Sequence, residues 1–319
     1  MITFIAEENY SPRAVALYKK LGEVYPHTKK FGVGVYFSKK YLNRADILVV
    51  RLALNVDKKI IDSAPNLKVI ATSTTGLNHI DVDYAKKKGI KVISLRGRTS
   101  FLKNIPSTAE ETMALILALM RRLPWAFDDV KSGGWDSTAW SGNQLFGKTL
   151  GLLGFGRLGK IVARYARAFG MNIVACDPYV SKKIMLSRGV KKVDMPTLFK
   201  TSDILSLHVL LTDDTRNLVK EKHLRTMRPS AYLINTARAE LIERDVLYKA
   251  LKNKRIAGAA IDVMWDEQPD GAHLKKDSLW KHAKENENLI ILPHIGGATI
   301  EAMHTTQDFI ADLVVKHFK

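Results

Sequence analysis

The chain has 319 residues, of which 46% are apolar and 26% charged, and its formal net charge is +18. This length allows two domains with large cores, and the composition is typical of globular proteins rather than of disordered chains. The single cysteine, Cys176, excludes an intrachain disulfide and a cysteine-rich zinc site. The longest apolar run, from Met113 to Met120, is too short to cross a bilayer. We therefore expect a cytoplasmic protein with no membrane partner.

The positive charge allows three interpretations: a nucleic-acid surface, a field that attracts anionic substrates, or an ordinary solvated surface. Many lysines come in pairs or triplets, such as Lys86-Lys87-Lys88, without interleaved aromatic residues. This pattern favours the solvated surface, with attraction of anionic substrates as an additional effect, so no nucleic-acid partner is expected.

The first hundred residues alternate short apolar strands with helical stretches, one of which is opened by Ser11 as N-cap and Pro12 as first helical residue. This alternation predicts a parallel sheet with crossover helices. A long apolar helix from Ser107 to about Arg122 follows. The predicted strands are 2–6, 46–50, 67–73 and 91–95.

A second strand–helix series begins at about residue 149, and a last helix from Thr299 to His317 ends the chain. We therefore predict two α/β domains, with the second inserted into the first. The expected bounds are 1–104 and 296–319 for the first domain and 105–295 for the second. The predicted strands of the second are 149–154, 172–177, 203–209, 231–236, 257–262 and 289–292.

The most specific segment carries Gly154, Gly156 and Gly159 between an apolar strand and an amphipathic helix, and Asp177 follows Gly159 by 18 residues at the end of the next strand. This pattern is typical of dinucleotide sites, where the glycines allow a tight turn, close approach of a pyrophosphate and helix–sheet packing. The helix that begins near Arg157 directs its free N–H groups at the phosphates. Because the Asp177 carboxylate would repel a 2′-phosphate, we expect NAD(H) rather than NADP(H). The alternative is an ordinary strand-to-helix turn with Asp177 as a cap.

Three further segments follow predicted strands and carry polar residues: 234–240, 260–269 and 292–299. Ligands of open parallel sheets bind at the carboxyl ends of the strands, so these residues are expected to converge on one crevice.

At these residues, and nearly from end to end, the sequence resembles the D-isomer-specific 2-hydroxyacid dehydrogenases. The resemblance includes Thr75–Asp81, Thr108–Glu110, the glycine motif and the segment from His208 to Thr212. It implies a Rossmann NAD-binding domain inserted into a flavodoxin-like substrate domain, both doubly wound. It also implies hydride transfer between NAD(H) and a small, D-configured 2-hydroxy or 2-oxo acid.

In that family an arginine, a glutamate and a histidine carry the chemistry, and the matching positions are Arg238, Glu267 and His294. Hydride addition to a 2-oxo acid develops negative charge on the carbonyl oxygen. A histidine can donate the proton, a glutamate can orient the ring and favour its charged form, and an arginine can grip the substrate carboxylate. If the loop were shifted by one residue, Gln268 would take the place of Glu267.

The resemblance also implies the residues that hold the ligands. Thr75 and Gly76 are expected to bind the substrate carboxylate. Arg51 is a substrate ligand or, equally, part of an ion pair, and the basic stretch from Arg96 to Lys103 is a solvated loop or a contact for a second anionic group. The expected cofactor residues are Thr108, Gly154, Gly156, Arg157, Leu158, Gly159, Asp177, His208, Val209, Thr236, Ala237, Asp262 and Gly297.

By the same resemblance we expect a homodimer that uses the helix after Ser107 and the region from Trp125 to Trp140. Candidate activities are phosphoglycerate dehydrogenase, glyoxylate or hydroxypyruvate reductase, and reduction of branched or aromatic keto acids. The alternative from another class is an NAD(H)-sensing, corepressor-like binding protein with little turnover.

Overall fold

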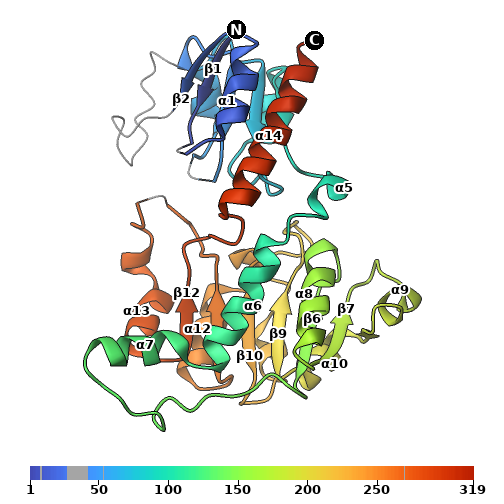
Figure 1. The fold of residues 1–319 in the computed structure, drawn as a ribbon, viewed down its shortest axis with the longest axis vertical. Coiled ribbons are helices and arrows are strands. Elements are labelled where there is room, and N and C mark those ends of the chain that lie inside the picture. The colour runs from blue at the N-terminus through green and yellow to red at the C-terminus, as the bar shows by residue number, and fades with distance from the viewer. Residues whose placement is uncertain (8, 27–41, 53, 269) are drawn as a thin grey trace. The chain divides into compact units, whose positions relative to one another are not determined.

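The computed structural model describes residues 1–7, 9–26, 42–52, 54–268 and 270–319. The chain forms two compact units, each built on its own sheet (Figure 1). Unit 1 contains Met1–Ile105, Gln268, Asp270 and Ala298–Lys319, and unit 2 contains Pro106–Glu267 and Gly271–Gly297. In sequence, unit 2 is thus inserted into unit 1.

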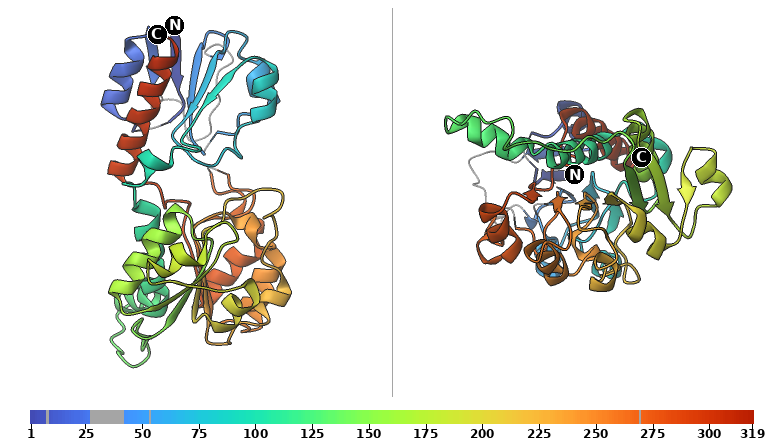
Figure 2. Two further views of the ribbon diagram at one scale, coloured as in Figure 1. Left: turned by 90° about the vertical axis from the view of Figure 1, so that its right-hand side faces the viewer. Right: turned by 90° about the horizontal axis from the view of Figure 1, so that it is seen from below.

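The sheet of unit 1 has the strand order β2-β1-β3-β4-β5, and all of its pairings are parallel. Helices α1 and α14 lie side by side on one face, and α3 and α4 cover the other (Figure 2). The strands are β1 (Ile2–Ile5), β2 (Glu23–Pro26), β3 (Ile47–Val50), β4 (Val69–Thr72) and β5 (Lys91–Ile93). The helices are α1 (Pro12–Lys19), α3 (Lys58–Asp62), α4 (Val82–Lys87), α5 (Thr99–Leu102) and α14 (Ile300–His317).

The alternation of side chains along β3 explains these two layers. Ile47 and Val49 are buried in the cluster that contains α1 and α14, whereas Leu48 and Val50 are buried against α3 and α4. Helix α1 begins as the sequence predicts, because the Ser11 hydroxyl accepts a hydrogen bond from the Ala14 N–H and Pro12 is the first helical residue.

The sheet of unit 2 has the strand order β12-β11-β10-β9-β6-β7-β8, again all parallel. The chain therefore reverses its direction of winding between β6 and β9, which is where parallel sheets open a ligand crevice. The strands are β6 (Thr149–Leu153), β7 (Asn172–Cys176), β8 (Lys191–Lys192), β9 (Ile204–Leu207), β10 (Tyr232–Asn235), β11 (Gly258–Ile261) and β12 (Leu289–Ile291).

Helices cover both faces of this sheet. The apolar residues of α6 and α8 share one buried cluster with alternate strand residues, and those of α10, α11, α12 and α13 share the other. The α-helices are α6 (Ser107–Met120), α7 (Leu123–Lys131), α8 (Arg157–Ala168), α9 (Lys182–Leu186), α10 (Met195–Thr201), α11 (Glu221–Leu224), α12 (Arg244–Lys252) and α13 (Ser278–Glu285), with short 3-10 turns η2 (Ala239–Leu241) and η3 (Leu274–Lys276).

The predicted fold class, two doubly wound parallel α/β domains, is confirmed. The predicted strands exist, and each is one to three residues shorter than predicted. Two edge strands, β2 and β8, were not predicted. Strand β2 ends in a proline and β8 consists of two lysines, so neither carries the apolar pattern that identifies a buried strand. Among the described residues, no helix combines the length and apolar character needed to cross a bilayer.

Candidate active site

The carboxyl ends of the strands of unit 2 carry most of the residues singled out from the sequence. Gly154 follows β6, Asp177 follows β7, His208 follows β9, Thr236 follows β10 and Asp262 follows β11. All these ends lie on one edge of the sheet, since every strand pairing is parallel. A ligand at this edge can therefore contact residues that are far apart in sequence.

In the turn from β6 into α8, two glycines are required because a side chain at either position would collide with the protein backbone. Gly154 has φ +94°, and a Cβ there would lie 2.6 Å from the His208 carbonyl oxygen. A Cβ on Gly159 would lie 2.5 Å from the Gly154 carbonyl oxygen. Gly156 differs, because a Cβ there would meet no protein atom within 4 Å, although this residue is the N-cap of α8 and no side chain caps the helix. The exposed backbone at Gly156 thus fits a phosphate group.

Asp177 lies beside this turn. Its Oδ2 accepts a hydrogen bond from the Phe155 N–H and its Oδ1 one from the Tyr179 N–H, both at 2.8 Å. The carboxylate is therefore held at the end of β7 next to the helix N-terminus. A helix N-terminus without a side-chain cap and an adjacent fixed carboxylate together match what a pyrophosphate and a ribose diol need.

Glu267 and His294 form a close ionisable pair in this unit. His294 Nδ1 lies 2.7 Å from Glu267 Oε2, and Glu267 Oε1 accepts the Met264 N–H at 2.8 Å. Burial alone would raise the pKa of Glu267. The hydrogen bond and charge of His294, together with the Met264 N–H and the charge of Arg238, outweigh that effect, so this pKa lies below its usual value. Glu267 is therefore a carboxylate, and it is Glu267 whose side chain meets the histidine.

The backbone at this pair is unusual. His294 has φ +58° and Asp266 has φ +56°, both in the left-handed region that non-glycine residues seldom adopt. Strained backbone of this kind persists where the surroundings hold it, and it concentrates at functional sites. The Arg244 guanidinium supports the loop from α12, since it pairs with Asp266 at 2.7 Å and with Asp277 at 3.5 Å.

Arg238 follows β10 in extended conformation and its side chain is largely enclosed. Its Nη1 donates a hydrogen bond to the Ala237 carbonyl at 2.6 Å. Burial lowers its pKa, and the charges of Glu267, Glu240 and Asp262 oppose that effect, so the guanidinium remains a cation. Asn235, which sequence analysis did not identify, shapes this turn by accepting from the Ala237 N–H and donating to the Arg238 carbonyl.

His208 carries no acid–base role in this arrangement. Burial lowers the pKa of His208 to about 4, and its Nε2 lies 2.9 Å from the Ser206 hydroxyl. The ring is thus neutral at physiological pH.

Of the remaining expected cofactor residues, Val209 and Ala237 follow the ends of β9 and β10, Arg157 and Leu158 lie in the first turn of α8, and Gly297 is the last residue of unit 2.

Helix α6 contacts this edge through Thr112. The Thr112 hydroxyl lies 2.9 Å from the Thr236 hydroxyl and donates to the Thr108 carbonyl at 2.7 Å.

Asp262 accepts hydrogen bonds from the Ile295 and Gly296 N–H groups at 2.7 and 2.8 Å. The turn after His294 is therefore anchored to the end of β11.

Arg51, Thr75 and Gly76 belong to unit 1, where they follow β3 and β4 at the carboxyl edge of that sheet. Arg51 forms an ion pair, with its Nη1 3.7 Å from Glu7 Oε1, and Glu7 also accepts from the Gln307 amide at 2.9 Å. Arg96, Arg98 and Lys103 are exposed around the short helix α5.

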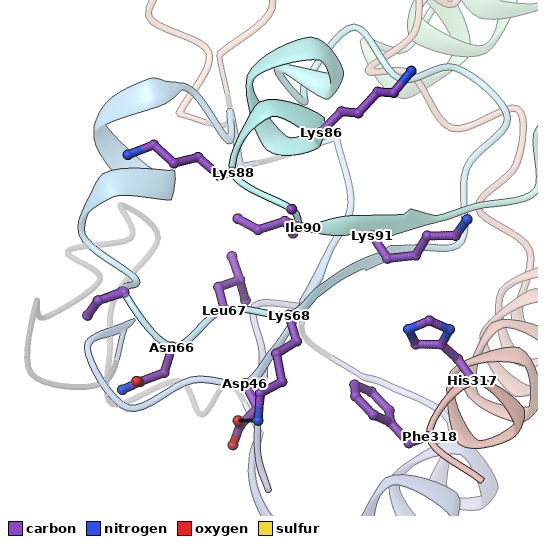
Figure 3. A pocket seen from close by; sticks show the side chains of 12 residues that line it. Asp46, Asn66, Leu67, Lys68, Lys86, Lys88, Ile90, Lys91, His317 and Phe318 are labelled. Carbon is purple, nitrogen blue, oxygen red and sulfur yellow. Dashed lines mark hydrogen bonds and ion pairs between the residues drawn. The ribbon is translucent and has the colours of Figure 1, made fainter.

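Unit 1 also has a cavity of about 830 Å³ at its opposite edge, where Asp46, Lys68 and Lys91 precede or begin β3, β4 and β5. Lys68 pairs with Asp46 and Lys88 with Asp62, each at 2.7 Å. Figure 3 shows the amino groups of Lys86 and Lys88 pointing away from each other. Because its cations are paired or divergent and it lies at the amino ends of the strands, this cavity is not the candidate active site.

Comparison with known proteins identifies the family. The model of the D-isomer specific 2-hydroxyacid dehydrogenase, NAD binding domain, matches residues 113–296. The chain belongs to the D-isomer specific 2-hydroxyacid dehydrogenase family. The resemblance seen in the sequence is thereby confirmed, as is NAD as the cofactor of this family's domain.

Members of this family match the chain over most of its length. Hydroxypyruvate reductase from Thermotoga maritima is 39% identical over 280 residues, which cover 88% of this chain and 86% of that protein. D-3-phosphoglycerate dehydrogenase from Methanocaldococcus jannaschii is 36% identical over 318 residues, 99% of this chain but 57% of that protein. The structure of D-lactate dehydrogenase from Aquifex aeolicus, complexed with NAD and lactic acid, has a TM-score of 0.81 and 30% identity, covering 100% of this chain and 95% of that one.

Proposed function

We propose that the chain is an NAD-dependent oxidoreductase that transfers a hydride between NAD(H) and a small 2-oxo or 2-hydroxy acid with D stereochemistry. The observation that carries this proposal is the Glu267–His294 pair beside Arg238, on the same sheet edge as the glycine turn. We further propose that unit 2 binds the cofactor and that unit 1 supplies substrate contacts.

In the proposed mechanism, bound NADH supplies the hydride. Since Nδ1 of His294 is engaged by Glu267, Nε2 is the nitrogen that donates a proton to the carbonyl oxygen of the substrate, and accepts it in the reverse direction. Glu267 holds the ring in place through its own anchor to the Met264 N–H. The planar fork of Arg238 binds the carboxylate of the substrate and polarises the adjacent carbonyl.

For the cofactor, we propose that the Gly156 and Arg157 backbone receives the pyrophosphate and that Asp177 accepts hydrogen bonds from the adenosine ribose. A fixed carboxylate at this place repels a 2′-phosphate, which supports NAD(H) over NADP(H). Each oxygen of Asp262 accepts one backbone N–H, which leaves lone pairs for the nicotinamide carboxamide. Thr108, Val209, Thr236, Ala237 and Gly297 are proposed to line the nicotinamide side.

The glycine turn allows a test that separates folding from binding. Gly156→Ala is expected to leave the melting temperature unchanged and to weaken NADH binding by tenfold or more (about 1.4 kcal/mol), because the new Cβ meets no protein atom but occupies the phosphate position. Gly154→Ala, the matched control, is expected to lower the melting temperature, because its Cβ collides with the His208 carbonyl. Equal NADH affinity in Gly156→Ala and wild type would contradict this assignment. Fluorescence titration and thermal unfolding measure the two quantities.

For the substrate, we propose that the Thr75–Gly76 backbone binds the carboxylate and that Arg51 contacts a further anionic group where one is present. The Glu7 pairing supports an orienting role, since it holds the guanidinium at the end of β3. Steady-state reduction of hydroxypyruvate, glyoxylate, pyruvate, 3-phosphohydroxypyruvate and 4-methyl-2-oxopentanoate tests the function. Preference for the phosphorylated acid would assign Arg51 and the basic stretch from Arg96 to Lys103 to the substrate. If the unphosphorylated acids are reduced as fast as the phosphorylated one, Arg51 is only part of an ion pair with Glu7.

We also propose a homodimer that uses the helix after Ser107 and the region from Trp125 to Trp140, where α7 has no buried residue. Its Leu123, Phe127 and Val130 are half or more exposed and lie on one helical face, and Trp135 after it is 89% exposed. Light scattering is expected to give twice the chain mass of 35.8 kDa for wild type and the single mass for Phe127→Glu. Leu186→Glu, on the exposed side of α9, serves as control and is expected to stay dimeric. A monomeric wild type would refute the proposal.

We place this enzyme in the cytoplasm. Cys176 is the single cysteine of the sequence, so the fold does not depend on an intrachain disulfide, as is usual in reducing compartments.

A further inference from the structure

A pair of buried carboxyl groups lies under the turn that carries His294. One is Asp262, at the end of β11, whose two oxygens accept the Ile295 and Gly296 N–H groups. The other is Glu111, which α6 brings to the same place and which sequence analysis did not identify. Both Glu111 oxygens are buried, and no N–H or O–H group of the described residues donates to them.

The two carboxyl groups meet at Gly296. A Cβ built on Gly296 would overlap Glu111 Oε2 and would lie 3.1 Å from Asp262 Oδ2. The absence of a side chain at Gly296 therefore lets the backbone of the turn lie directly against Glu111. Its N–H simultaneously donates to Asp262, so both carboxyl groups contact one peptide unit of the catalytic turn.

Two adjacent carboxyl groups in a buried place cannot both be ionised at modest cost, so they share one proton. Asp262 accepts two backbone N–H groups and faces the charge of His294, which favours its ionised form. Glu111 has no such donors. Burial, and then the charge of Asp262, raise the pKa of Glu111 to about 8. Burial raises the pKa of Asp262 as well; we assign the shared proton to Glu111 because Asp262 holds the backbone donors.

The charged groups around the pair come from several elements. His294 follows β12 and Arg238 follows β10, and both act on Asp262. Glu110, the preceding residue of α6, is exposed. No other charged group acts on Glu111 among the described residues to the extent that Asp262 does.

We propose that Glu111 is a positioning residue: its protonated carboxyl donates a hydrogen bond to Asp262 and so fixes the Ile295–Gly296 turn and the left-handed backbone of His294. This inference rests on the proposed dehydrogenase function. Loss of the proton places two negative charges against one turn and removes the hydrogen bond. The enzyme is then expected to lose its aligned histidine as pH rises through the titration of the pair.

The oxidation direction isolates this effect. There His294 must accept a proton, and a rise in pH does not oppose that step. Wild type is expected to lose kcat above about pH 8, by up to tenfold for each further pH unit. Glu111→Gln keeps a donor toward Asp262 but cannot ionise, so its kcat is expected to stay level over that range. Glu285→Gln, an exposed glutamate at the end of α13, is the matched control and should follow wild type.

Infrared spectroscopy gives a readout that does not require turnover. A carbonyl band of a protonated carboxyl group is expected in wild type at pH 6.5. It is expected to be absent in Glu111→Gln and to disappear from wild type as the pH rises through about 8. Thermal unfolding gives another. Since the pKa of Glu111 is raised on folding, wild type loses stability as pH rises from the unfolded to the folded value, and the melting temperature of Glu111→Gln relative to wild type should increase over that interval.

The proposal would be overturned if wild type lacked the infrared band. It would also be overturned if kcat declined at alkaline pH in Glu111→Gln as it does in wild type. The first result does not depend on the folding of any variant. If no 2-hydroxy acid is oxidised by any form while the band and the melting shift are present, the proposed function fails and the shared proton stands. If turnover is normal but the band is missing, the shared proton fails and the proposed function stands.

Discussion

Replacing His294 with asparagine is expected to lower kcat for reduction of a 2-oxo acid by about 10²–10⁴-fold while NADH binding is retained. The loss arises because asparagine cannot donate and recover a proton at the carbonyl oxygen. Asparagine is the informative substitute, since it tolerates the left-handed backbone found at this position, φ +58°, better than most residues. Steady-state kinetics and NADH titration measure the two effects.

The control for this variant is His317→Asn, which changes an exposed histidine at the end of α14. It should match wild type in kcat and KM. A His294→Asn enzyme with a kcat close to that of wild type would show that another group transfers the proton. In that case the 2.7 Å contact between Glu267 and His294 would be structural only.

Replacing Arg238 with glutamine is expected to lower kcat/KM by about 10²–10³-fold, since losing an enclosed charged contact to a carboxylate costs about 3–4 kcal/mol. Arg238→Lys keeps the charge but not the planar fork, so an intermediate loss is expected. NADH affinity should change little in both variants. The kinetics of the best substrate, with NADH titration, provide the measurement.

Arg228→Gln is the matched control, because Arg228 pairs with Asp203 on the surface at the amino end of β9. Its removal is expected to leave kcat/KM unchanged, as for most exposed ion pairs. If Arg238→Gln lost NADH affinity and kcat/KM in the same proportion, Arg238 would be a cofactor ligand rather than a substrate ligand.

Features of this protein that depend on local sequence could be predicted from the sequence. The strand–glycine–helix pattern around Gly154 and the strand-end position of Asp177 follow from residue spacing. The alternation of strands with helical stretches predicts parallel sheets covered by helices. Helix capping is equally local, as Ser11 and Thr299 show in α1 and α14. Edge strands β2 and β8 could not be predicted, since their pairing is decided by neighbours and not by their own side chains.

The rest depends on contacts that spacing does not report. Glu111 lies on α6 and meets Asp262, which is 151 positions later in sequence, only because the helix packs against β10 and β11. Glu7, Arg51 and Gln307 likewise form their contacts across the whole length of the chain. The neighbouring Glu110 is also acidic but is exposed, so residue type alone does not distinguish Glu111 from a surface glutamate.

The turn around Arg238 could be predicted from the sequence, but the side chain that supports it could not. Arginine after a strand is visible in the sequence, whereas Asn235 appears there as an ordinary end of a strand. In the structure its side chain binds both Ala237 and the Arg238 backbone. Residues that hold a functional group in place through the backbone leave little trace in residue type.

The most direct measurement is the reduction of NAD by D and L enantiomers of lactate, glycerate and 3-phosphoglycerate, followed by the absorbance of NADH, with NADH binding measured on the same preparation. We expect oxidation of at least one D enantiomer, none of its L counterpart, and loss of that activity in His294→Asn. Oxidation of L enantiomers would contradict the stereochemical assignment. If the protein binds NADH tightly but neither oxidises these acids nor reduces the 2-oxo acid panel, the proposed dehydrogenase activity is contradicted. That result would favour an NAD(H)-sensing protein.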